Sequence, residues 1–166
     1  AEHTVVNPLR LRSATVNELE VSLLLCFTGR TRLSARIVEK QAQAYVARES
    51  DVVAALDEMK RLTLEMKARL LRDRLREFGE LLHEAWEWKK KLQSEITNPG
   101  IDKLYARARG EGAIGGKLLG AGGGGYLAVL VPFERRHLVA AALEAEGGTI
   151  VPFSFEPNGL QTWTVA

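Results

Sequence analysis

Hydrophobic residues form one continuous run near the start of the chain, at residues 21–28 with the sequence VSLLLCFT. A run of this length predicts a strand buried on both faces, although periodicity alone leaves a helical segment as the alternative. Gly29 ends the run. Residues 4–12, TVVNPLRLR, contain a proline and predict an extended arm ahead of the strand.

Three helices are predicted next, because apolar residues recur there at spacings of three and four. The first runs from Arg32 to about Arg48, the second begins at Ser50 and Asp51, which can cap it, and the third covers about 75–92. The second helix carries its apolar stripe at Val53, Leu56, Met59, Leu62, Met66 and Leu70, and the third at Leu75, Phe78, Leu81, Leu82, Ala85, Trp86 and Leu92.

A fourth helix is predicted to begin at TNPGID, with Asn98 as its cap and Pro99 at its first position, and to end near residues 109–110. The glycine-rich segment 110–125 that follows cannot be helical, since each glycine costs up to about 1 kcal/mol relative to alanine. The predicted order after this helix is a strand at 114–119, a tight loop at 120–125, a strand at 126–131, a helix at 135–146 and strands at 149–155 and 160–165.

This order of elements predicts an α+β domain with a ferredoxin-like antiparallel sheet and several helices packed on one face. The extra helices fall in the first crossover, between the first and second strands. We assign residues 1–12 to the arm and residues 13–166 to the domain.

Composition adds few constraints on function. The hydrophobic fraction of 46%, the charged fraction of 27% and the net charge of +2 are ordinary for a globular domain, and the basic residues do not cluster as they do for nucleic acid. Cys26 is the only cysteine, which excludes a disulfide framework and fits a reducing, cytoplasmic setting. No apolar stretch reaches membrane-spanning length, and no His, Cys or carboxylate cluster has metal-ligand spacing.

The glycine-rich segment fails the common nucleotide-binding patterns. Two windows match G-x-G-x-x-G, but the first follows a predicted helix and the second leads into a predicted strand, whereas a dinucleotide fingerprint follows a strand and opens a helix. A P-loop is excluded because Lys117 is followed by Leu118 instead of Ser or Thr, and position 111 is Glu.

Glycines permit positive φ and leave no Cβ in the way, so their amides can converge on an anion or approach another surface closely. The alternative is a hairpin turn, which needs fewer glycines than this loop has. We therefore select the loop residues as a candidate site, namely Gly120, Ala121, Gly122, Gly123, Gly124 and Gly125.

The glycine-rich segment and several other stretches of the sequence resemble a known family. GGKLLGAGGGGYLAVLVP is similar to the glycine-rich third motif of the GHMP kinases, in their C-terminal domain. The stretches LLLCFTGRTRLSARIVEKQ, EFGELLHEAWEWKKKL, TNPGIDKLYARARGEGAIGGKLLGAG and VPFSFEPNG resemble the heptose-kinase and fucose-kinase branch, so the resemblance covers nearly the whole chain.

The resemblance implies the C-terminal half of a kinase that transfers the ATP γ-phosphoryl group to a sugar hydroxyl, with heptose 7-phosphate as the acceptor. ATP and Mg²⁺ are implied for the full-length enzyme and are not expected on this chain alone, since the family's phosphate-binding loop and catalytic carboxylate lie in an N-terminal domain that these residues do not match. We expect the N-terminal domain to be the partner of this chain. We expect none of the catalytic residues to lie in this chain. The rival interpretations are a fucose-type kinase and a ferredoxin-like binding module without chemistry.

Acceptor contacts are predicted in the TGRTR stretch, at Thr28, Gly29, Arg30 and Arg32. Amides at a helix N-terminus attract anions, and arginines add fork-shaped donors, so a phosphorylated sugar suits this position. The alternative is that a threonine caps the helix and that the arginines are solvated.

Other polar residues have less specific surroundings. Lys117 can contact phosphate or point to solvent, and His83 lies on an apolar stripe, where packing is favoured over catalysis. The run of lysines at 89–91 predicts a solvated helix end that complements the helix dipole. Without the partner domain we expect the chain to dimerise or exchange its arm.

Overall fold

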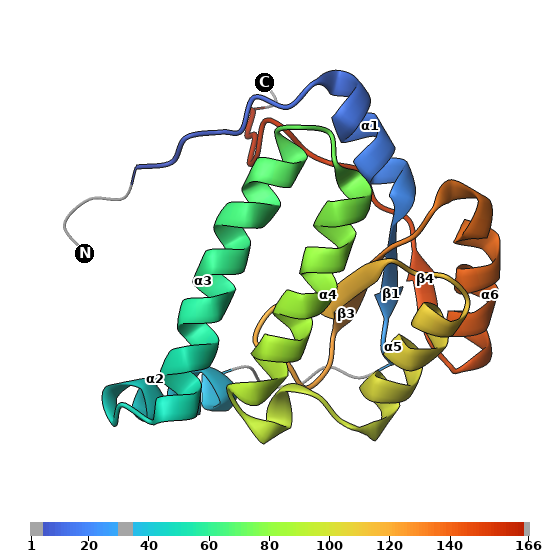
Figure 1. Cartoon of the computed structure of the whole chain (residues 1–166). Coiled ribbons are helices and arrows are strands. Elements are labelled where there is room, and N and C mark those ends of the chain that lie inside the picture. Colours follow the sequence, from blue (N-terminus) through green and yellow to red (C-terminus); the bar gives the residue numbers. More distant parts are fainter. Residues whose placement is uncertain (1–4, 30–34, 165–166) are drawn as a thin grey trace.

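The computed structural model describes residues 5–29 and 35–164, and Figure 1 shows them as one layer of helices over a sheet. The elements in chain order are α1 (Ser13–Ser22), β1 (Leu23–Phe27), α2 (Ala35–Val46), α3 (Ser50–Leu70), α4 (Leu75–Lys91), η1 (Ser94–Ile96), α5 (Pro99–Gly110), β2 (Gly115–Leu118), β3 (Tyr126–Leu130), η2 (Phe133–Arg135), α6 (Arg136–Ala145) and β4 (Thr149–Val151).

The four strands form one antiparallel sheet in the order β2-β3-β1-β4. Leu25 of β1 lies opposite both Ala128 of β3 and Val151 of β4, so β1 and β3 are the central strands. The crossover from β1 to β2 contains α2 to α5, and the crossover from β3 to β4 contains α6. The predicted α+β class and the ferredoxin-like strand order are therefore confirmed.

The core lies between the central strands and the helices. Leu24 and Cys26 of β1 and Leu127 and Val129 of β3 are buried, while Leu25 and its alternate neighbours remain partly exposed on the other face. Period-two alternation of this kind places one face of a sheet against the core. The helices lie on this one side of the sheet (Figure 1), as the sequence predicts.

Helix α4 approaches the edge strand β2 very closely, because both carry glycine at the contact. A Cβ on Gly115 would lie 1.9 Å from the carbonyl oxygen of Gly79, and a Cβ on Gly79 would lie 2.7 Å from Leu130 Cδ2. Trp86, which is completely buried, is on the same helix. This contact brings the C-terminal end of α4 to the point where β2 ends.

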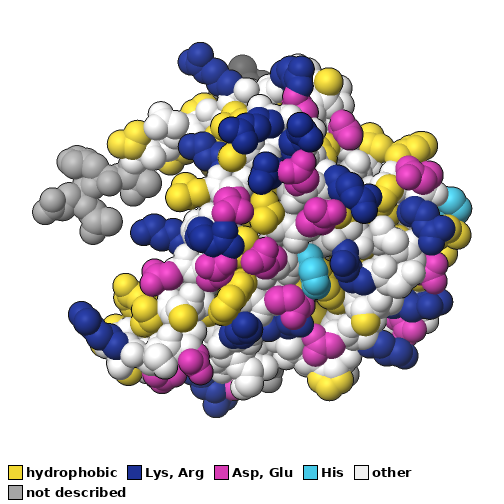
Figure 2. Space-filling view, in the orientation of Figure 1, with side chains coloured by type: hydrophobic (Ala, Val, Ile, Leu, Met, Phe, Trp, Pro, Cys, Tyr) yellow, Lys and Arg dark blue, Asp and Glu magenta, His cyan; other side chains and the backbone are white. Residues whose placement is uncertain are grey.

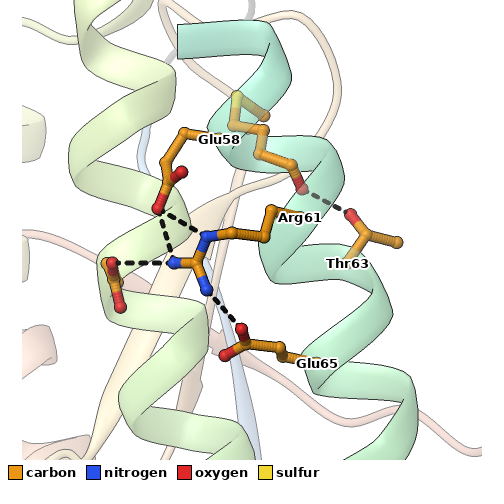
Figure 3. Close-up of polar contacts among 6 residues, drawn as sticks. Glu58, Arg61, Thr63 and Glu65 are labelled. Atoms are coloured by element: carbon orange, nitrogen blue, oxygen red, sulfur yellow. Dashed lines mark hydrogen bonds and ion pairs between the residues drawn. The ribbon is translucent and has the colours of Figure 1, made fainter. Parts of the chain in front are cut away.

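Helices α3 and α4 are joined on their outer surface by Arg61, as Figure 3 shows. The guanidinium contacts Glu58 and Glu65 on its own helix and Glu84 of α4, at 3.6 Å for the last. Figure 2 shows Lys and Arg side chains mixed with Asp and Glu side chains over this face, so no single-sign patch forms on it. No helix within the described part of the chain is long and apolar enough to cross a membrane.

Several predicted boundaries are wrong. Val21 and Ser22 end α1, a helix that the sequence analysis does not predict, so the first strand begins at Leu23. Glu49, not Ser50 or Asp51, occupies the N-cap of α3, and its side chain makes no capping hydrogen bond. By contrast, the Asn98 side chain accepts from the amides of Gly100 and Ile101, which confirms the predicted start of α5.

The C-terminal strands are also shorter than predicted. β4 ends at Val151 because the next residue is Pro152, which has no N–H to donate to the sheet. Among the described residues beyond it, 160–164 form no strand and are exposed. The apolar residues of this tail therefore do not extend the sheet.

Candidate functional site

The site predicted at residues 120–125 is a loop that leaves β2 and enters β3. Gly120, Gly122, Gly123 and Gly125 have φ values of +71°, +125°, +78° and +102°, which L side chains rarely adopt. A Cβ on Gly122 would also lie 2.7 Å from the Cα of Ile96. The loop thus needs glycine both for its conformation and for its close approach to η1.

Backbone and side-chain contacts hold the far half of this loop in place. The Gly123 amide donates to the Ile96 carbonyl oxygen at 2.8 Å, and Asn98 Nδ2 donates to the Gly123 carbonyl oxygen at 3.3 Å. On the other side, the amide and the hydroxyl of Thr28 both donate to the Gly125 carbonyl oxygen, at 2.9 and 3.0 Å. Asn98 therefore both caps α5 and holds the loop.

The near half of the loop is held by Lys89 of α4. Lys89 Nζ donates to the carbonyl oxygens of Leu118 at 3.2 Å and Gly120 at 2.5 Å. The side chain is only 7% exposed. Burial, with a smaller contribution from the charge of Lys117, lowers the Lys89 pKa to about 8.

Lys89 is thus not part of a solvated helix end, and the prediction for residues 89–91 is wrong at this position. Lys91 is exposed, with its Nζ 3.6 Å from the centre of the Trp88 ring, and Lys90 pairs with Glu87 at 2.8 Å. The sequence contains a signal for the difference, because Lys89 continues the buried spacing that runs through Ala85 and Trp86.

Most amides of the loop have no acceptor in the described part of the chain. Gly123 is the exception described above. The amides without an acceptor there belong to Gly120, Ala121, Gly122, Gly124 and Gly125. Several unpaired N–H groups in one glycine-rich turn form a surface suited to an anion or to polar oxygens of a ligand.

Of the predicted acceptor contacts, the structure places Thr28 at the loop and does not test the roles of the other residues. Thr28 is bound to the loop through Gly125, so its hydroxyl contributes to holding the loop. Gly29 is exposed with φ of +77°. Arg30 and Arg32 lie outside the described residues, and their acceptor role stays a prediction.

Lys117 lies on β2, directly before Leu118, whose carbonyl oxygen Lys89 binds. It is half-buried and faces Ala128 across the β2–β3 pair, and its side chain makes no hydrogen bond or ion pair with any described residue. Its charge is close enough to lower the pKa of Lys89. The strand that leads into the loop therefore carries a lysine with no acidic partner among the described residues.

His83 is occupied in packing, which agrees with the favoured interpretation. Its Nδ1 lies 2.8 Å from the Tyr105 hydroxyl, and the two rings stack with centres 5.8 Å apart. Burial and the nearby Arg109 lower the His83 pKa, while burial raises the pKa of Tyr105. Across the described residues, no three His, Cys, Asp or Glu side chains converge in a way that could hold a metal ion.

Comparison with known families agrees with this fold and this loop. The family described as GHMP kinases C terminal matches residues 66–149, about half of the chain, from within α3 to the first residue of β4. The match contains α4, the glycine-rich loop and both strands that flank it. The chain therefore belongs to the GHMP kinase C-terminal family.

Individual relatives extend the similarity over the whole chain. It is 29% identical over 164 residues to D-glycero-alpha-D-manno-heptose 7-phosphate kinase of Campylobacter jejuni, which covers 99% of this chain and 48% of the relative. It is 30% identical over 125 residues to the bifunctional fucokinase/GDP-fucose pyrophosphorylase of Arabidopsis thaliana, covering 75% of this chain and 12% of that protein. The chain thus spans about half or less of the length of these relatives.

A solved structure supports the same placement. The D-glycero-D-manno-heptose 1-phosphate kinase from Bacteroides thetaiotaomicron superposes with a TM-score of 0.61 at 29% identity, over 91% of this chain and 38% of that one. The arrangement of helices and sheet is therefore shared with a kinase of known structure.

Proposed function

We propose that this chain is the C-terminal half of an ATP-dependent sugar kinase, and that the acceptor is a heptose 7-phosphate. The observation that carries the proposal is the loop at 120–125, which is held in place by Lys89, Asn98 and Thr28 and whose amides, apart from that of Gly123, have no acceptor among the described residues. The similarity to a heptose 7-phosphate kinase over 99% of the chain supports this acceptor.

In phosphoryl transfer the protein contributes little covalent chemistry. Positioning of the reactants and stabilisation of charge therefore account for most of the catalysis. In this proposal the loop forms one wall of the site, with its amides facing the phosphoryl groups or the sugar. Lys117 adds a positive charge on the strand that leads into the loop, and Arg30 and Arg32 bind the phosphate of the acceptor. Each of these contacts aligns the reactants or neutralises charge.

ATP and Mg²⁺ are assigned mainly to the other half of the kinase. The described residues offer no cluster of oxygen ligands for Mg²⁺ and no P-loop, so they do not fit the metal or the triphosphate by themselves. Mg²⁺ would neutralise phosphate charge in the complete enzyme. We infer no step of the reaction in which a residue of this chain binds the metal.

The second candidate is a fucose-type kinase, which the 30% identity to the Arabidopsis fucokinase favours. The discriminating experiment is ADP release by this chain joined to the N-terminal half, measured with heptose 7-phosphate, with fucose and without acceptor. The proposal predicts release that depends on heptose 7-phosphate and exceeds release with fucose by at least about tenfold. Release with fucose alone would favour the second candidate, and release with neither acceptor would contradict the assignment to a sugar kinase of this branch.

A further inference from the structure

Lys89 is a buried cation that has no acidic partner among the described residues. Its hydrogen bonds within that part of the chain go to two main-chain carbonyl oxygens, those of Leu118 and Gly120. Burying a charged group costs free energy unless hydrogen bonds compensate for it, and an apolar side chain could fill this space without that cost. Lys89 therefore supplies two hydrogen-bond donors at this position in addition to its volume.

The bond from Lys89 to Gly120 also fixes the direction of the next amide. In a trans peptide the C=O and the following N–H lie in one plane and point in opposite directions. Since the Gly120 carbonyl points toward Lys89, the Ala121 N–H points away from α4. The φ of +71° at Gly120 is part of this orientation.

The neighbouring peptide supports this geometric argument. Lys89 also binds the Leu118 carbonyl, so the following amide, that of Leu119, must point the opposite way. It does, because the Leu119 amide donates to the Tyr126 carbonyl oxygen at 2.8 Å across the hairpin. At Ala121 no described residue provides such an acceptor, and the amide remains available.

Asn98 has the same relation to the other side of the loop. Its Nδ2 donates to the Gly123 carbonyl oxygen, so the Gly124 amide points away from Asn98, and it too has no acceptor in the described part of the chain. Two side chains from the helical layer thus hold two carbonyls inward and leave two amides available for a ligand. Lys89 makes the shorter of these contacts, 2.5 Å against 3.3 Å.

We propose that Lys89 is a positioning residue of the kinase, which orients the Gly120–Ala121 peptide so that the Ala121 amide donates to an oxygen of the phosphoryl group in transfer. The proposal rests on the proposed function. Lys89 itself does not touch the reactants. The chemical class recognised by the Ala121 amide is a phosphate oxygen that gains charge during the reaction.

The first test compares Lys89→Met with Lys91→Met in this chain. Both variants remove one lysine charge from the end of α4, but Lys91 is exposed and makes no hydrogen bond to the loop. Amide NMR shifts and hydrogen exchange should change at residues 119–122 in Lys89→Met and stay unchanged there in Lys91→Met. Unchanged loop amides in Lys89→Met would overturn the proposal.

The second test measures kinetics in the complete kinase, with this chain joined to the N-terminal half. A contact that forms mainly in the transition state affects kcat more than KM, and losing one such donor costs about 100- to 1,000-fold in kcat. In Lys89→Met the Ala121 amide is still present but is no longer held in one orientation, so the loss should be smaller than for a removed donor. We expect kcat to fall by about 10- to 100-fold, while the KM values for both substrates change less than about 3-fold. A rise in KM with unchanged kcat would overturn the proposal.

Lys89→Arg separates positioning from packing, and it also serves if Lys89→Met does not fold. It keeps a cation with several donors at this place, so it should retain at least about one fifth of the wild-type kcat. Equal losses in the Arg and Met variants would assign Lys89 to packing and overturn the proposal. If the wild-type kinase itself transfers no phosphoryl group, the proposed function fails, which these variants do not test.

Discussion

At the scale of single residues, the burial of Lys89 links its protonation to folding. The free side chain has a pKa of about 10.4, whereas burial and the charge of Lys117 lower the pKa in the folded chain to about 8. Between these two pH values the unfolded chain binds more protons than the folded chain, so the contribution of Lys89 to stability increases as pH rises. The neutral amine still has two N–H donors for its two carbonyls.

The measurement is urea unfolding of the wild type and Lys89→Met at several pH values. The wild type should gain stability over the variant between pH 8 and pH 10.5, by no more than about 3 kcal/mol, since one pKa unit corresponds to about 1.36 kcal/mol. Below pH 8 the difference should be constant. A difference that stays flat up to pH 10.5 would show that the pKa of Lys89 is not lowered.

Two alanine variants separate the two reasons for glycine in the loop, which are positive φ and lack of space for a Cβ atom. Gly120→Ala introduces a side chain at φ of +71° with no atom within 4 Å, so it should cost only the backbone strain, about 1–2 kcal/mol. Gly122→Ala has φ of +125° and places Cβ 2.7 Å from Ile96 Cα, so it should cost at least about 1 kcal/mol more. Chemical denaturation measures both, and equal costs would contradict the close approach of the loop to η1.

The sequence alone predicts that Arg30 and Arg32 bind the phosphate of the sugar acceptor. Replacing both with alanine in the complete kinase should raise KM for the sugar phosphate more than KM for ATP, because an arginine–phosphate contact contributes about 1.5–3 kcal/mol. Steady-state kinetics with each substrate varied in turn provides the comparison. An unchanged acceptor KM would mean that the two arginines are solvated.

The sequence predicts some features of the site and not others, for identifiable reasons. The glycine run permits positive φ in the loop, and Gly122 and Gly123 both have it. The role of Lys89 was missed because a lysine at a helix end is usually solvated, and only its place on the buried stripe distinguishes it from Lys90 and Lys91. The loop's contacts with Asn98 and Thr28 join distant segments, which no local pattern reveals.

At the scale of elements, α4 and β2 pack so closely that neither Gly79 nor Gly115 has space for a Cβ atom. Gly115→Ala would place its Cβ 1.9 Å from a backbone oxygen of Gly79, so the helix must move away from the strand. Overpacking usually costs about 1–3 kcal/mol, and a clash with backbone should reach or exceed the upper end.

The matched control is Gly110→Ala, at the end of α5, where a Cβ meets nothing within 4 Å. It should be neutral or stabilising by up to about 1 kcal/mol. Thermal unfolding of both variants tests the contact. If Gly115→Ala proved as stable as Gly110→Ala, the close packing of α4 on β2 would be contradicted.

Elements with strong local signals were predicted well, and those without were not. Helix α5 combines an Asn98 cap with Pro99 at its first position, and the prediction is confirmed at both ends. Helix α1 has weak amphipathic character and no capping side chain, so its sequence SATVNELEVS gave no signal before the strand. The last predicted strand does not form over its described residues, 160–164, because a turn ahead of a segment does not provide a partner strand.

At the scale of the whole molecule, we propose that the chain supplies one wall of a site whose other parts lie outside its described residues. Most amides of the loop have no acceptor among the described residues, while the triphosphate and Mg²⁺ need ligands that these residues do not offer. Catalysis of phosphoryl transfer requires the phosphates, the metal and the acceptor to be aligned together. We therefore propose that the activity belongs to the complete kinase and not to this chain alone.

Calorimetric titration of the isolated chain with Mg-ATP, together with an assay for ADP release in the presence of heptose 7-phosphate, tests this claim most directly. The account predicts no saturable heat up to millimolar ATP, and no ADP release that depends on the sugar. Saturable binding with sugar-dependent ADP release would contradict it, because the nucleotide site would then lie within these 166 residues.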